Sequence, residues 1–96
     1  MIHSPAHPGG ILAEELAELG ISVSRASREL GISRQTLSAI VNERSPVTAD
    51  MAVRIGHYVG NGAEIWARLQ MNHDLWHAQR RMKRVLKKLP RASAVR

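Results

Sequence analysis

The stretch LGISRQTLSAIVNER, residues 30–44, decides the fold. Gly31 follows a run of apolar residues at helical spacing, and four polar residues, 33–36, come before leucine and isoleucine resume. A glycine lets the backbone reverse without a Cβ clash, and Ser33 is a favourable residue to cap a new helix. The stretch therefore predicts two short helices joined by a tight turn, with the polar start of the second helix facing outward.

Apolar spacing predicts further helices around this pair. Upstream, leucines recur at i, i+4 and i+7 until Gly20 is placed to end their helix. Ser22 is placed to cap the helix that leads into Gly31, and Thr48 begins a fourth helix, which ends at the glycines of residues 60–62. The residues expected to face inward are Leu12, Leu16, Leu19, Val23, Ala26, Ser27, Leu30, Leu37, Ile40, Val41, Ala52, Ile55 and Val59.

The fifth predicted helix is the longest, because nothing interrupts it from Ala63 to Leu89. Alternating segments typical of strands are few, and the chain has one tyrosine and no phenylalanine. We therefore expect an all-α protein with one domain over residues 9–79. A flexible leader, residues 1–8, precedes it, and a basic C-terminal extension, residues 80–96, forms the end of the last helix and a tail.

Charge is distributed unevenly along the chain. Residues 1–79 hold six arginines and all eight acidic residues, a net charge of −2, whereas the extension holds eight basic residues and no acid, a net charge of +8. The overall charge of +6 is thus a property of the extension alone. Such a segment attracts nucleic-acid phosphate, although a solvated, partly disordered tail is an equally good interpretation.

Several classes of protein are disfavoured. The chain has no cysteine and no apolar run long enough for a membrane span or signal peptide, so we expect a soluble cytoplasmic protein. No nucleophile elbow, glycine-rich phosphate loop or HExxH motif is present, so we expect neither an enzyme nor a cofactor. His73 and His77 have the i, i+4 spacing of metal ligands, but they lack further ligands, and no metal site is expected; His57, His3 and His7 add no pattern.

Two helices joined by a glycine-containing turn are typical of the helix-turn-helix, whose second helix lies in the DNA major groove. In such a helix Arg34 suits guanine, Gln35 suits adenine, and Ala39 suits the methyl group of thymine. Hydroxyl groups near helix N-termini commonly bind phosphate. The residues expected to contact DNA are Ser24, Ser33, Arg34, Gln35, Thr36, Ser38, Ala39 and Asn42. The alternative is a solvated helix face.

A second pattern lies on the last helix. Apolar residues alternate at spacings of four and three, which is typical of a coiled-coil seam. We call this set the apolar seam: Met71, Leu75, Ala78, Met82, Val85 and Leu89. So small a body cannot cover so long a helix, and a second copy related by two-fold symmetry is the simplest partner. The expected dimer or partner interface is Met71, Leu75, Trp76, Ala78 and Met82. A helix that folds back on its own core, or frays after residue 80, is the alternative.

The motifs together resemble a known family. VSRASRELGISRQTLSAIVNERSPVTADMAVRI is similar to the lambda-repressor/Cro-like (XRE) helix-turn-helix class, and the HPGGIL opening, TADMAVRIG and EIWARLQMNHDLW extend the resemblance to HigA-type (VapI family) antitoxins over about His7 to Trp76. The resemblance implies a five-helix lambda-repressor-like domain with a long C-terminal helix. It also implies a homodimer that represses its own operon and neutralises a HigB/RelE-like mRNA endonuclease toxin. Glu43, where glycine is frequent, and the basic tail depart from the family pattern.

Three functions remain open at this point. The first is an antitoxin of a type II toxin-antitoxin system that binds operator DNA. The second is a stand-alone transcriptional repressor without a toxin, and the third is a nonspecific nucleic-acid-binding protein acting through the tail. Because toxins of the expected type tend to be basic, we expect a toxin to dock on the acidic first helix, near Glu14, Glu15 and Glu18, and the extension to be left for nucleic acid.

Overall fold

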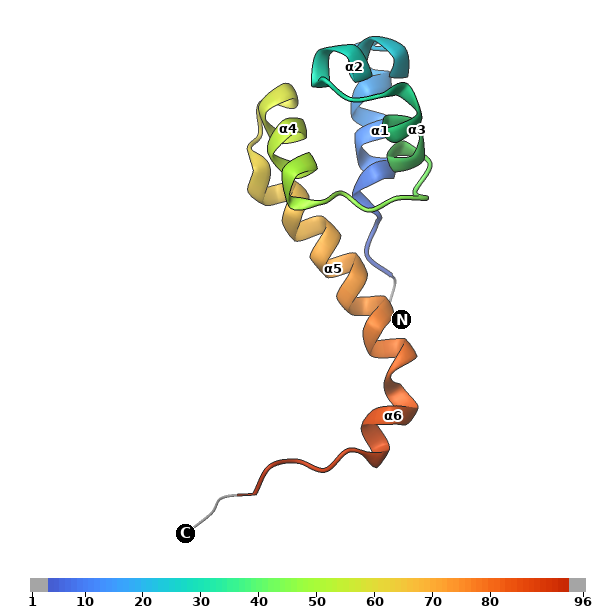
Figure 1. Ribbon diagram of the computed structural model, residues 1–96, viewed down its shortest axis with the longest axis vertical. Coiled ribbons are helices and arrows are strands. Elements are labelled where there is room, and N and C mark those ends of the chain that lie inside the picture. The colour runs from blue at the N-terminus through green and yellow to red at the C-terminus, as the bar shows by residue number, and fades with distance from the viewer. Residues whose placement is uncertain (1–3, 94–96) are drawn as a thin grey trace.

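The computed structural model describes residues 4–93, and these form six α-helices and no strand (Figure 1). Residues 1–3 of the expected leader and 94–96 of the expected extension lie outside the described part. The helices are α1 (Pro8–Leu19), α2 (Val23–Leu30), α3 (Arg34–Val41), α4 (Ala49–Val59), α5 (Ala63–Arg81) and α6 (Lys83–Lys88). The first four gather into a body from which α5 runs outward, so the molecule measures 59 × 30 × 24 Å (Figure 1). None of the described helices is long and apolar enough to cross a membrane.

Three of the predicted helix starts are confirmed. The side-chain oxygen of Ser22 accepts a hydrogen bond from Arg25 N at 3.1 Å, and that of Ser33 accepts one from Thr36 N at 3.0 Å. Thr48 Oγ1 accepts the corresponding bond from Met51 N at 3.2 Å. Each side chain thereby satisfies an amide that has no partner inside its helix, which is why the chain begins helices at these positions.

The start of α1 differs from the prediction, which placed residues 7 and 8 in a flexible leader. His7 is buried and caps the helix, because its Nδ1 accepts a hydrogen bond from Gly9 N at 2.9 Å, and Pro8 is the first helical residue. A Cβ atom at Gly9 would lie 1.7 Å from the carbonyl oxygen of Ile40, so only glycine lets α1 approach α3 this closely. The leader boundary therefore falls before His7.

The core lies between the body helices and the first turns of α5. Its buried apolar residues are Leu12, Leu16, Ala26, Leu30, Leu37, Ile40, Val47, Ala52, Ile55 and Trp66. Val23, Val41 and Val59 pack against it while partly exposed. The prediction for Leu19 is wrong, because this side chain is 56% exposed in the last turn of α1, beyond the edge of the core.

The expected single helix from Ala63 to Leu89 is also wrong, because α5 ends at Arg81 and a turn at Met82 separates it from α6. Met82 N bonds to Ala78 O at the end of α5, and Leu86 N bonds to Met82 O in the first turn of α6, so one helix follows the other with only Met82 between them. Every residue from 79 to 93 is exposed, and hence no packing holds the helix straight. Cations three and four residues apart also repel one another, which weakens the helix here.

Candidate nucleic-acid interface

The turn between α2 and α3 is tight and internally bonded. Gly31 has φ +73°, the left-handed conformation that glycine adopts without strain. Gly31 N donates to Arg28 O at 3.2 Å, and Ile32 N donates to Ser27 O at 3.0 Å. The hydroxyl of buried Ser27 donates to Ser24 O at 2.9 Å, so this small polar side chain is satisfied inside the helix. These bonds fix the angle between the two helices.

Residues of α4 brace α2 from behind. Arg54 Nη1 donates to Leu30 O at 2.8 Å, which satisfies a carbonyl at the end of α2. The Tyr58 hydroxyl donates to the Glu29 carboxylate, which also pairs with Arg25 at 3.1 Å. The hydrogen bond from Tyr58, and then the charge of Arg25, lower the pKa of Glu29, whereas burial and then Glu29 raise the pKa of Tyr58. Glu29 is therefore held ionised between α2 and α4.

The N-terminal half of α3 presents unpaired polar side chains. Arg34 and Gln35 are exposed, and within residues 4–93 neither side chain makes a hydrogen bond or an ion pair. They line one shallow hollow together with Ser38, Ala39 and Arg44. Side chains that project from a helix N-terminus without internal partners are available to a ligand, and the neighbouring backbone amides favour anions.

Several of the other expected DNA contacts are engaged within the chain. Ser33 Oγ donates to Thr36 Oγ1 at 2.7 Å while capping α3, and Asn42 Nδ2 donates to Ser38 O at 2.8 Å and to Ser38 Oγ at 3.3 Å. Ser24 lies on α2, partly exposed. These residues frame the helix, and their contact with DNA stays a prediction.

Arg44 joins the hollow although sequence reasoning did not select it. Glu43 takes φ +61°, a left-handed conformation that glycine adopts most easily. The chain therefore reverses after α3, Arg44 N bonds to Ala39 O at 2.8 Å, and the Arg44 side chain returns toward Arg34. The signal was available, because a residue just past a helix end commonly folds back over its last turn.

Gln70 on α5 anchors the segment that follows α3. It is 7% exposed, its Oε1 accepts a hydrogen bond from Val47 N at 2.7 Å, and its Nε2 donates to Asp74 Oδ1 at 2.8 Å. A buried glutamine with both ends paired is favourable, whereas an unpaired one is costly. The loop from α3 to α4 is thus fastened to the helix that carries the apolar seam.

Three histidine rings, those of His7, His73 and His77, lie in a row beside the start of α1. The ring centroids of His7 and His73 lie 4.9 Å apart, and those of His73 and His77 lie 4.5 Å apart. Burial, and then the charge of His73, lower the pKa of His7, while Glu43 and Asp74 oppose this. Within residues 4–93 no group of three or more histidine or acidic residues is arranged to hold a metal ion.

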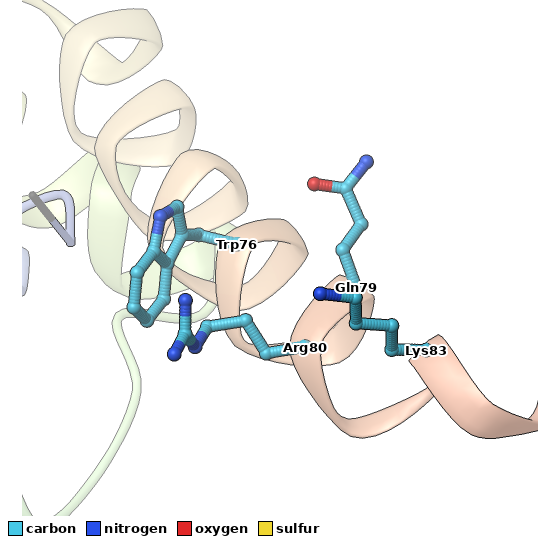
Figure 2. A pocket seen from close by; sticks show the side chains of 4 residues that line it. All are labelled: Trp76, Gln79, Arg80 and Lys83. Carbon is cyan, nitrogen blue, oxygen red and sulfur yellow. The ribbon is translucent and has the colours of Figure 1, made fainter. Parts of the chain in front are cut away.

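The apolar seam is open to solvent. Met71, Leu75 and Met82 are 63%, 51% and 41% exposed, whereas Trp76 and Ala78 are partly buried. The guanidinium of Arg80 lies 4.6 Å from the ring centroid of Trp76, and Gln79 and Lys83 line the same hollow (Figure 2). The seam and this hollow lie on different sides of the helix.

A capped pair of short helices, a left-handed glycine between them and an exposed polar start on the second define a helix-turn-helix domain. The sequence model of the helix-turn-helix family matches residues 12–61. Virulence-associated protein I of Dichelobacter nodosus is 38% identical over 74 residues, which cover 76% of this chain and 68% of the relative. Antitoxin HigA-1 of Vibrio cholerae is 31% identical over 78 residues, which cover 80% of this chain and 72% of the relative.

Among solved structures, the Pseudomonas aeruginosa antitoxin HigA with the higBA promoter is similar to this chain at a TM-score of 0.86 and 34% identity, over 94% of this chain and 99% of that one. The chain belongs to the XRE-type helix-turn-helix family and, within it, to the HigA antitoxins. Because the extension is only 17 of the 96 residues, an overlap of 94% includes most of it.

Proposed function

We propose that this protein is an antitoxin that represses its own operon by binding operator DNA as a homodimer and that neutralises a HigB/RelE-like mRNA endonuclease. One observation carries the proposal: Arg34 and Gln35 stand exposed and unpaired, within the described residues, at the start of a helix that is capped by Ser33 and packs against α1 and α2. A rigid helix that presents free polar groups is suited to reading base edges in the major groove.

The roles within the interface follow from side-chain chemistry. The guanidinium of Arg34 suits the two acceptors of guanine, the amide of Gln35 suits adenine, and the methyl group of Ala39 suits thymine. Arg44 and the hydroxyl group of Ser38, in the same hollow, suit the phosphates beside those bases. The relative from Pseudomonas aeruginosa, solved with its promoter, supports this assignment through its overall similarity.

Dimerisation is proposed through the apolar seam. Met71, Leu75 and Met82 leave about half of their surface in water on one side of α5, and apolar stripes of this kind are normally covered by a partner. A two-fold arrangement would present two recognition helices to DNA, with half-sites about 34 to 36 Å apart.

Alanine substitutions test the DNA-reading part. Arg34→Ala and Gln35→Ala should each lose about 1 to 3 kcal/mol of discrimination between the DNA upstream of the gene and a scrambled duplex. Glu18→Ala, on the far end of α1, is a matched control that should leave the discrimination unchanged. Equal discrimination in all four proteins, wild type included, would contradict the role of α3. Binding is measured by titrating labelled duplexes.

The toxin surface is proposed on the acidic outer face of α1. Glu14 and Glu18 are exposed, and Glu15 is partly exposed, while residues 1–79 together have a net charge of −2. A basic nuclease is attracted to such a face and repelled by the extension. Charge therefore favours separate surfaces for toxin and DNA.

Co-expression with the neighbouring gene tests the antitoxin part. The neighbour should arrest growth when expressed alone and should co-elute with this protein when both are present. Glu14→Lys with Glu18→Lys should weaken the complex, whereas Arg34→Ala should not. A harmless neighbour that fails to co-elute would leave a stand-alone repressor as the function.

A further inference from the structure

The cations of the extension and its apolar residues lie on opposite sides of the helix. At about 100° per residue, the apolar seam falls on one side, and the cations fall roughly 170° away. We call these cations the cationic stripe: Arg80, Lys83, Arg84, Lys87 and Lys88. The comparison extends across Met82 because this single residue between α5 and α6 stays in the right-handed helical region of the backbone, with φ −87° and ψ −1°.

The cationic stripe continues the side of α5 that packs on the body. Trp66, Gln70 and His73 point to this side, and the stripe extends it beyond the edge of the body. The cations therefore project on the same side of α5 as the body that carries α3. A partner on the apolar seam would leave them uncovered.

Within residues 4–93 no carboxylate neutralises the stripe. The two ion pairs in this part of the chain are Arg25 with Glu29 and His73 with Asp74. All five stripe residues are exposed, and Arg80 lies against the ring of Trp76 beside Gln79 and Lys83 (Figure 2). An uncompensated row of cations along a helix is a strong attractor of a polyanion.

The body alone supplies little attraction to DNA. Residues 1–79 have a net charge of −2, and Arg34 and Arg44 are the cations in the hollow on α3, while Arg25 of α2 is paired with Glu29. Phosphate neutralisation nevertheless accounts for much of the affinity of DNA-binding proteins. The charge that the recognition surface lacks is present on the extension.

We infer that the cationic stripe binds the phosphate backbone of duplex DNA flanking the operator while the opposite, apolar side of the same helix contacts the second copy. The inference rests on the proposed function, because it gives the extension a role in operator binding. Recognition would then be divided: α3 selects the sequence, and the stripe supplies affinity that does not depend on sequence.

The test compares two stripe variants. One carries Lys83→Gln, Arg84→Gln, Lys87→Gln and Lys88→Gln, and the matched control carries Lys83→Arg, Lys87→Arg and Lys88→Arg, which keeps every charge. The probes are a duplex from the DNA upstream of the gene and a scrambled duplex of the same length, titrated between about 50 and 200 mM salt. Sedimentation and helical circular dichroism check that both variants keep the assembly state and fold of the wild type.

The glutamine variant should lose affinity for both duplexes by the same factor, at least about tenfold at the lowest salt. The slope of log affinity against log salt should become shallower by about 0.9 for each phosphate that is no longer neutralised, so by about 2 or more units. The arginine control should keep both the affinity and the slope. The ratio of affinities for the two duplexes should not change in either variant.

An unchanged slope in the glutamine variant would overturn the inference. Loss of the dimer in the glutamine variant would also overturn it, because the cations would then serve assembly. A third contrary result is a glutamine variant that binds anionic phospholipid vesicles less tightly than the wild type but binds both duplexes equally well. The proposed function fails separately: if the wild type binds both duplexes equally, α3 does not read the operator, and the salt slope still decides whether the stripe binds phosphate.

Discussion

Two tryptophans ten residues apart on α5 lie in opposite surroundings. Trp66 is 2% exposed, and its indole N–H donates to Asn61 Oδ1 at 2.8 Å. Trp76 is partly exposed, with Arg80 over its ring and the ring centroid of His77 4.9 Å from its own. The first half of α5 is thus fixed by the core of its own chain, whereas the second half, with α6, has few internal contacts and depends on what binds it.

This contrast separates the part of the fold that is stable by itself from the part that serves interactions. Helical stability in proteins comes mostly from packing of an apolar face. On α5 such packing reaches Leu69 and Gln70, and α6 has no buried residue and no side-chain cap. The end of the helix continues into solvent, where its surfaces are available to other molecules.

The largest effect is expected at the buried tryptophan. Trp66→Ala should lower the free energy of unfolding by about 3 to 5 kcal/mol, because it leaves a cavity at the junction of α4 and α5. Trp76→Ala is the matched control on the same helix and should cost far less. Urea denaturation of both variants measures the difference, and similar losses would show that α5 is packed evenly along its length.

An effect on assembly is expected from the apolar seam. Leu75→Asp should weaken self-association by about 2 kcal/mol or more, because a charge would be placed in an apolar contact. The helical content of the isolated protein should hardly change, since Leu75 is 51% exposed. Analytical ultracentrifugation measures the association, and a dimer as strong as that of the wild type would exclude the seam as its interface.

A smaller effect is expected from the protonation of His7. Its folded-state pKa is below the ordinary value of 6.5, so the neutral ring stabilises the fold above about pH 6.5, and this contribution is lost as the pH falls through the lowered pKa. Protonation would remove the Nδ1 acceptor of the α1 cap, which is worth about 1 kcal/mol. His7→Asn keeps an acceptor that does not titrate and should reduce the loss of stability in acid. Chemical denaturation at several pH values measures it, with His57→Asn, on the exposed end of α4, as the control.

The smallest effect is expected in α6. Lys87→Ala should change the free energy of unfolding by less than about 0.5 kcal/mol, because the side chain is exposed and touches no core residue. Thermal unfolding of this variant should match that of the wild type. A clear loss of stability would mean that α6 packs on the fold in solution.

Local signals in the sequence were enough for most of the body. Ser22, Ser33 and Thr48 cap helices as predicted, because a cap depends on a hydrogen bond only three residues away. The inward residues of α2 to α4 follow from helical periodicity, and the helix-turn-helix follows from these together. The prediction for Leu19 fails because periodicity identifies the apolar face of a helix but does not show at which residue the core ends.

Contacts between distant parts of the chain could not be predicted in this way. Gln70 accepts a hydrogen bond from Val47, which is 23 residues away in the sequence. The ring of His7, which caps α1, contacts the ring of His73 on α5. No local sequence pattern predicts either contact. Histidine is also an unusual cap, although Pro8 after it was a usable sign of a helix start. The turn at Met82 lies where no side chain packs on the core, since every residue from 79 to 93 is exposed. The regular apolar spacing of the seam predicts a continuous helix and gives no sign of this turn.

The sequence predicted the candidate residues at the start of α3 but not the one that follows the helix. Arg34 and Gln35 follow from their position at a helix start, whereas Arg44 reaches the hollow only because Glu43 reverses the chain. The assignment of these residues to DNA contact stays a prediction.

The buried bond from Val47 N to Gln70 ties the loop behind α3 to α5, and α5 carries the surface on which two copies would join. In such a dimer the distance between the two copies of α3 is set by α5 and by the loop that is bonded to it. An operator whose half-sites are spaced or phased differently would have to be curved or twisted to fit. The stiffness of the DNA between the half-sites then becomes part of what the protein selects, even at base pairs that no side chain touches.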